Sequence, residues 1–156
     1  MGLKIGNKAH DFSLNNQAEE KKSLKEFQGK WVILYFYPKD NTSGCTMEAI
    51  EFTALKEEFE KLDAVILGIS PDPPKSHRNF IEKKELGITL LSDPDHKVIN
   101  AYSAWQKKKN NGREYYGVAR STVLIDPRGK IAYVWPKVKV KGHAEAVKVK
   151  LAELQS

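Results

Sequence analysis

Cys45 is the only cysteine of the 156-residue sequence, and it stands in the stretch "YPKDNTSGCTMEAI" at residues 37–50. A thiol reacts as its thiolate, and an ordinary free cysteine has a pKa of about 8.5, so its surroundings must favour the anion before it can act as a nucleophile. Thr42, three residues earlier, offers a hydroxyl that both donates and accepts hydrogen bonds. Pro38 fixes its own φ and shapes the loop. Together these residues suit nucleophilic or redox chemistry at sulfur.

Each of these residues also has a purely structural explanation. A lone cysteine is often a small buried hydrophobe, Thr42 could cap a helix, and Pro38 could end a strand. The position of Cys45, between an apolar run and a helical pattern, favours reactivity. In the first turn of a helix the sulfur would meet backbone amides without intrahelical acceptors and the positive end of the helix dipole. Ligand sites of open α/β sheets lie at such strand ends.

The elements that must position these residues follow from the apolar pattern. The runs "WVILYFY" and "AVILGIS" are apolar throughout, which is typical of strands covered on both faces. We expect strands at 10–15, 31–37, 64–70 and 88–93 and two more within 121–136. We expect helices at 23–30, 46–62, 73–86, 96–105 and 144–154. In the second of these helices, Met47 and Ile50 fall on the apolar face and Glu48 among the polar positions. This order predicts one α/β domain, residues 1–156, with a central mixed β-sheet flanked by helices on both faces.

The formal charge of +6 is concentrated near the C-terminus, where residues 101–156 hold 12 Lys and Arg against 4 Asp and Glu. Two stretches mix lysines with aromatic residues, "WQKKKNNGREYY" at 105–116 and "WPKVKVKGH" at 135–143. We interpret them as a solvated loop and an alternating edge segment. A basic patch of this kind can bind a phosphate backbone, but no base-reading motif accompanies it, and nucleic acid is not an expected partner.

Other classes of protein are excluded by composition. The longest apolar run has seven residues, too few to cross a bilayer, so we expect no membrane partner. One cysteine and four scattered histidines provide no zinc-type ligand spacing, so we expect no metal. The N-terminal residues lack a secretory h-region, and the cytoplasm is the expected location.

Pro38, Thr42 and Cys45 reproduce the P-x-x-x-T-x-x-C signature of peroxiredoxins. The blocks "YFYPKDNTSGCTMEAIEF", "VILGISPD", "LLSDPDHKV", "GVARSTVLIDPRGKI" and "WPKVKVKGHA" resemble the bacterioferritin comigratory protein branch, or Q subfamily. The resemblance implies a thioredoxin-like fold and reduction of hydroperoxides without a cofactor. It also implies that Arg120 approaches the sulfur, where its planar guanidinium would favour the thiolate and hold peroxide oxygens.

The expected site also includes Glu48 and Gly44. Glu48 could hold Arg120 in place, or it could be a solvated helix carboxylate. The backbone N–H groups around Gly44 and Cys45 would stabilise charge on the leaving oxygen of the peroxide.

The sequence departs from this branch at two positions. Many members carry a second cysteine five residues after the first, where this chain has Ile50, and Ser43 replaces a common proline and can cap the helix instead. Ile50 can instead anchor the helix in the core. The resemblance therefore implies a one-cysteine enzyme whose sulfenic acid is reduced by an external thiol.

Several alternatives stay open. The thiol could be a small molecule, a thioredoxin- or glutaredoxin-like protein, or Cys45 of a second chain, and the protein could be a monomer or a homodimer. The expected function is a thiol-dependent peroxidase acting on hydrogen peroxide and organic hydroperoxides. The alternative is a peroxide sensor or thiol-dependent binding protein with little turnover.

Overall fold

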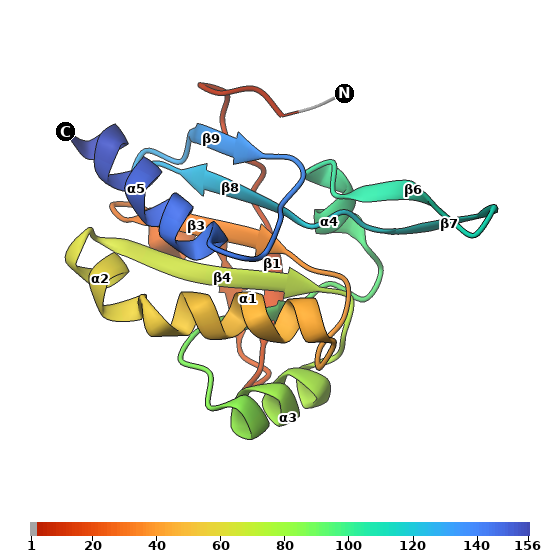
Figure 1. Ribbon diagram of the computed structural model, residues 1–156. Helices are drawn as coiled ribbons and strands as arrows, with labels where there is room; N and C mark the ends of the chain where they lie inside the picture. The colour runs from red at the N-terminus through yellow and green to blue at the C-terminus, as the bar shows by residue number, and fades with distance from the viewer. Residues whose placement is uncertain (1–2) are drawn as a thin grey trace.

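The computed structural model describes residues 3–156, which form a seven-stranded mixed sheet and a two-stranded hairpin (Figure 1). The large sheet has the strand order β2-β1-β5-β4-β3-β8-β9. Its strands are β1 Ser13–Asn16, β2 Lys21–Ser23, β3 Trp31–Phe36, β4 Ala64–Ser70, β5 Thr89–Ser92, β8 Ser121–Ile125 and β9 Ile131–Trp135. The hairpin is β6 Trp105–Asn110 and β7 Arg113–Val118. The helices are α1 Ser43–Ala54, α2 Lys56–Lys61, α3 Pro74–Lys84, α4 Lys97–Ala101 and α5 His143–Gln155, with a 3₁₀ turn η1 at Leu24–Phe27.

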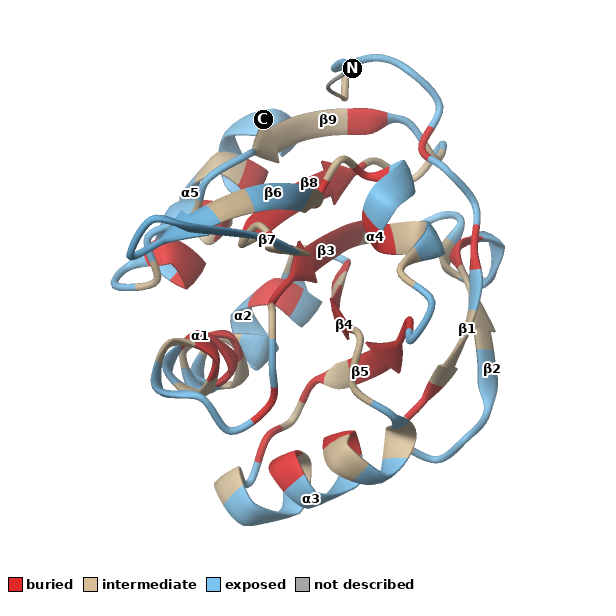
Figure 2. Ribbon diagram, turned by 90° about the vertical axis from the view of Figure 1, so that its right-hand side faces the viewer, coloured by how far each residue is buried: buried red, intermediate tan, exposed pale blue. Residues whose placement is uncertain are grey.

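Strands β3, β4 and β8 form the buried centre of the sheet (Figure 2). β3 runs parallel to β4 and antiparallel to β8, so the sheet is mixed, as the order of elements predicted. Alternate side chains of β3 face opposite sides. Ile33 and Tyr35 join a core cluster beneath α1 and α5, whereas Val32 and Leu34 join a second cluster with α4. Helices therefore cover both faces, as expected.

The face that α1 turns toward the sheet differs from the prediction. Met47 and Ile50 are 48% and 46% exposed, although the apolar pattern placed both in the core. Ala49, Phe52 and the carboxylate-bearing Glu48 are buried instead. The buried face is the one that carries Cys45, and there Glu48 pairs with Arg120, the residue just before β8. The expected role of Ile50 as a core anchor is therefore wrong.

The helix predicted over 46–62 is divided into α1 and α2. The division falls at Leu55, whose amide bonds the carbonyl of Phe52 in a tighter turn than that of an α-helix. On either side of it Phe52 and Phe59 are fully buried, with their ring centroids 6.1 Å apart. Both phenylalanines belong to the same core cluster, one on each side of this break.

The basic segment expected to be a loop forms the β6–β7 hairpin, which projects from the body of the molecule (Figure 1). Its turn contains Asn111 and Gly112, both at positive φ, 52° and 76°. An Asn-Gly turn of this kind matches the twist of paired strands and is a strong hairpin signal. The second basic stretch is not an edge strand, since residues 136–141 bend between β9 and α5.

None of the helices in residues 3–156 is both long enough and apolar enough to span a membrane.

Candidate active site

Cys45 is the third residue of α1, at the end of the molecule where β3 and β4 finish (right side of Figure 1). β3 ends at Phe36, and the chain crosses a short loop before α1 begins at Ser43. The first amides of a helix have no intrahelical acceptor and carry the positive end of its dipole. The side chain of Cys45 is 1% exposed. The sulfur therefore lies buried where backbone dipoles stabilise negative charge.

Arg120 reaches this sulfur from the start of β8. The register of β3 with β8 pairs Phe36 with Ser121, so the residue before Ser121 lies beside the end of β3. Its Nη2 donates a hydrogen bond to Cys45 Sγ at 3.3 Å. Cys45 is thus in contact with a cation, which distinguishes it from an inert cysteine packed only among hydrocarbons.

The second guanidinium nitrogen of Arg120 is held by Glu48. Arg120 Nη1 lies 2.8 Å from Glu48 Oε1, and Glu48 is only 1% exposed. Burial raises the pKa of Glu48 to about 7, although the charge and hydrogen bond of Arg120 act in the opposite direction. The pKa of Arg120 is raised, because the neighbouring Cys45 and Glu48 outweigh the effect of burial, which would lower it. The contact suggested for Glu48 in the sequence is present.

Gly44 leaves room for the guanidinium. A Cβ atom at this position would lie 3.1 Å from Arg120 Nη2, closer than ordinary van der Waals contact. A larger residue would therefore push the guanidinium away from the sulfur.

Thr42 and Pro38 lie in the loop that leads into α1. Thr42 is the N-cap residue, and Ser43, which the sequence suggested as a cap, is the first helical residue. The Thr42 hydroxyl is exposed and donates to the carbonyl of Lys39 at 2.8 Å, not to the sulfur. Its oxygen can still accept a hydrogen bond. Pro38 is half-buried, two residues beyond the end of β3.

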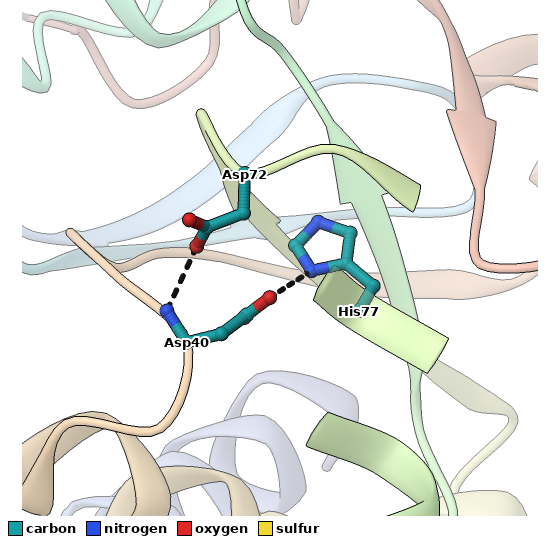
Figure 3. Close-up of side chains that lie close together, drawn as sticks. All are labelled: Asp40, Asp72 and His77. Carbon is teal, nitrogen blue, oxygen red and sulfur yellow. Dashed lines mark hydrogen bonds and ion pairs between the residues drawn. The ribbon is translucent and has the colours of Figure 1, made fainter. Parts of the chain in front are cut away.

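A buried polar network, which sequence reasoning missed, fixes this loop (Figure 3). The carboxylate of Asp40 accepts hydrogen bonds from Tyr37 at 2.6 Å and Ser76 at 2.7 Å and lies 2.7 Å from Nδ1 of His77. The Asp40 amide donates to Asp72 at 2.8 Å. Asp40 and His77 are 5% and 0% exposed. The network ties the loop to α3 and to the segment after β4.

Three of these residues, Asp40, Asp72 and His77, bring potential metal-ligand atoms within 4.8 Å of one another. Each of these side chains is already engaged by a hydrogen bond within the network. We therefore describe the group as a hydrogen-bond network that holds the loop in place. Its residues come from three separate segments, and no spacing in the sequence could have indicated it.

His143, the first residue of α5, lies close enough to Arg120 to be affected by its charge. Burial, followed by the charge of Arg120, lowers its pKa to about 4. Its Nε2 lies 2.8 Å from the hydroxyl of Thr122 on β8. At neutral pH the ring is therefore uncharged and adds no second cation beside Arg120.

Comparison with known proteins identifies the family. Residues 5–134 match the model of the AhpC/TSA family. The chain is 49% identical to peroxiredoxin Bcp of Bacillus subtilis over 148 residues, which cover 94% of each chain. It is 41% identical to peroxiredoxin Bcp of Escherichia coli over 145 residues, 93% of each.

Solved structures show the same fold. A Xanthomonas campestris bacterioferritin comigratory protein, studied for alkyl peroxide reduction, aligns with a TM-score of 0.91 at 38% identity over 99% of this chain and 98% of that one. A cysteine-to-serine mutant of Xylella fastidiosa PrxQ aligns with a TM-score of 0.95 at 36% identity over 100% and 99%. The mixed sheet with helices on both faces is accordingly thioredoxin-like. The chain belongs to the AhpC/TSA family, as a peroxiredoxin of the Bcp group.

Proposed function

We propose that this peroxiredoxin reduces hydrogen peroxide and alkyl hydroperoxides with Cys45 as the attacking thiolate. The observation that carries the proposal is the 3.3 Å contact of Arg120 Nη2 with Cys45 Sγ at the first turn of α1. Thiol-dependent peroxidase activity is the activity of its family. The alkyl peroxide reduction studied in the Xanthomonas campestris relative supports an organic hydroperoxide as one substrate class.

The first step transfers one oxygen atom to sulfur. The thiolate attacks one peroxide oxygen in line with the O–O bond, that bond breaks, and the other oxygen leaves as hydroxide or alkoxide. Cys45 becomes a sulfenic acid, and the leaving oxygen takes a proton to give water or an alcohol. Arg120 and the amides of Gly44 and Cys45 stabilise charge on the leaving oxygen, and the Thr42 hydroxyl holds a peroxide oxygen.

The second step restores the thiol. Position 50, where a second cysteine could stand, is Ile50, and the sequence contains one cysteine. A thiolate from another molecule attacks the sulfenic sulfur, water leaves, and a mixed disulfide forms. A second external thiol then releases Cys45 and takes away a disulfide product. Because Cys45 must return to the free thiol in every cycle, the reducing cytoplasm is the fitting compartment.

A peroxide-consumption assay with an added dithiol tests the proposal. Cys45→Ser should abolish consumption of hydrogen peroxide, and Met47→Ala, an exposed position on the same helix, should keep it. Wild-type protein should consume many equivalents of peroxide, whereas a sensor would stop near one. Wild-type turnover in the Cys45→Ser variant would disprove the assignment of Cys45.

A further inference from the structure

The β6–β7 hairpin places lysine side chains in a groove that Arg120 also lines. A groove of about 400 Å³ beside the hairpin is lined by five cationic side chains, Lys107, Lys108, Lys109, Lys137 and Arg120. Among the residues that line it, none is acidic. Arg120 lines this groove and also contacts the sulfur of Cys45, so a molecule bound in the groove can reach a residue that touches the reacting atom.

The positive charge of this groove is only partly neutralised. Lys107 pairs with Glu114 at 2.7 Å, and Arg120 pairs with the buried Glu48. Lys108 makes no ion pair with any carboxylate in residues 3–156. It is half-buried, and burial, together with the charge of Arg120, lowers its pKa, while Cys45 acts in the opposite direction. A partly desolvated lysine without a carboxylate partner favours binding of an anion from outside.

We propose that this groove binds the carboxylate of a small thiol that reduces the sulfenic acid of Cys45. The inference rests on the proposed function and adds the chemical class of the reductant. The volume suits a small molecule, since ligand pockets span about 300–1,000 Å³. Every cycle requires an external thiol, whereas hydrogen peroxide carries no carboxylate. In an N-acylated cysteine or a short cysteinyl peptide, a few bonds separate sulfur from carboxylate, so a carboxylate bound in the groove keeps the thiol near Arg120, the residue that contacts Cys45.

The reaction in this complex is a displacement at sulfur. The bound thiolate attacks Cys45 Sγ, the S–S bond forms, and the S–O bond of the sulfenic acid breaks. The leaving hydroxide takes a proton from solvent and departs as water. The incoming thiol is oxidised and the Cys45 sulfur is reduced, which gives the mixed disulfide that a second thiol then resolves.

A single-turnover experiment tests the charge of the reductant. One equivalent of hydrogen peroxide converts Cys45 to sulfenic acid, and N-acetylcysteine or N-acetylcysteine amide is then added. These two thiols differ in the carboxylate. The rate of mixed-disulfide formation is measured by mass spectrometry and divided by the thiolate concentration. We expect the acid to react about five-fold faster than the amide in wild-type protein at low salt, and this preference should shrink as salt screens the charges.

Variants then test whether Lys108 causes the faster reaction of the acid. Lys108→Met keeps most of the side-chain length without the charge and should bring the ratio of the two rates close to one, while Lys108→Arg should preserve it. Lys61→Ala, an exposed lysine on α2 at the other end of the molecule, removes the same charge and should leave the ratio as in wild type. Use of a ratio removes any general effect of Lys108 on the reactivity of the sulfur.

Three results would overturn the proposal: equal rates for acid and amide in wild type, an unchanged ratio in Lys108→Met, or a carboxylate preference found only in the first step. The last is tested with linoleic acid hydroperoxide against its methyl ester. Failure of Cys45 to form a sulfenic acid at all is a different result, which would refute the proposed peroxidase function and not the groove alone.

Discussion

Arg120 contacts the sulfur of Cys45 and the carboxyl group of Glu48 with two different nitrogens of one rigid plane. Nη2 meets Cys45 at 3.3 Å and Nη1 meets Glu48 at 2.8 Å. The hydrogen bond from Nη1 to Glu48 fixes the plane, and the fixed plane directs Nη2 toward the sulfur. Lysine has a single ammonium on a flexible stem, and it cannot present two donors in this geometry.

The variant Arg120→Lys should therefore keep a positive charge yet lower the second-order rate constant for hydrogen peroxide by about 100-fold, the effect of losing one fixed donor to a developing charge. Stopped-flow tryptophan fluorescence measures this constant. Arg113→Lys, at the exposed tip of the hairpin, is the matched control. A rate constant for Arg120→Lys close to that of wild type would mean that charge alone is sufficient at this position.

The residues of the site were predictable to different degrees. The spacing of Pro38, Thr42 and Cys45 within eight positions carried the motif, so these could be named from the sequence. The role of Glu48 as the partner of Arg120 could not be decided from the sequence, because a helix carboxylate three residues after Cys45 normally faces solvent. Only the approach of Arg120, 72 positions away, makes burial of Glu48 tolerable.

At the level of elements, the loop before α1 depends on Asp40. Its two carboxylate oxygens accept hydrogen bonds from Tyr37 and Ser76 and face His77. An asparagine offers one acceptor oxygen, and its NH₂ group would face a donor. A buried polar group left unsatisfied in this way is costly. Because the loop holds the first turn of α1, the effect should concentrate near the active site.

Asp40→Asn should lower the free energy of unfolding by about 3 kcal/mol and raise amide hydrogen exchange across residues 37–46. Hydrogen-exchange mass spectrometry of the folded protein measures the second effect. Asp72→Asn is the control, since its side-chain oxygen can still accept from the amide of Asp40. Faster exchange spread evenly over all elements would show that Asp40 supports general stability and not this loop.

Local pattern predicted the buried apolar strands best. The buried run at 64–70 coincides with β4, because seven consecutive apolar or small residues leave little alternative. The apolar spacing of Met47 and Ile50 was misleading. The face of α1 that packs against the sheet carries Cys45 and Glu48, and Met47 and Ile50 lie outside it. The β6–β7 hairpin was missed although its Asn111-Gly112 turn was visible, because lysine-rich strands lack the apolar alternation on which the prediction depended.

Across the whole molecule, pairing of β3 with β8 joins parts of the site that are distant in sequence. Phe36 opposite Ser121 sets Arg120 beside Cys45, and a shift of one residue would turn the side chains of β8 to the other face. The order of elements predicted a mixed sheet, but no local pattern specifies which residues of two apolar strands lie opposite each other. The family resemblance supplied that contact.

Two buried groups near Arg120 give opposite pH dependence to the stability of the whole molecule. Burial raises the pKa of Glu48 from 4.5 to about 7, so its contribution to stability is complete below pH 4.5 and is lost as the pH rises through 7. Burial, followed by the charge of Arg120, lowers the pKa of His143 from 6.5 to about 4, so its contribution is complete above pH 6.5 and is lost as the pH falls through 4. In wild type these two changes nearly cancel between pH 6.5 and 4.5.

Removing either group should leave only the other group's effect on how the free energy of unfolding changes with pH. From pH 6.5 to 4.5, Glu48→Gln should lose about 2 kcal/mol of unfolding free energy relative to wild type, because only the His143 contribution remains. His143→Gln should gain about 2 kcal/mol over the same interval, because only the Glu48 contribution remains. Urea denaturation of the three proteins at both pH values measures these differences. Parallel profiles for all three would show that neither group changes its protonation on folding, whereas opposite slopes would confirm that both are held in their uncharged forms around a permanently charged Arg120.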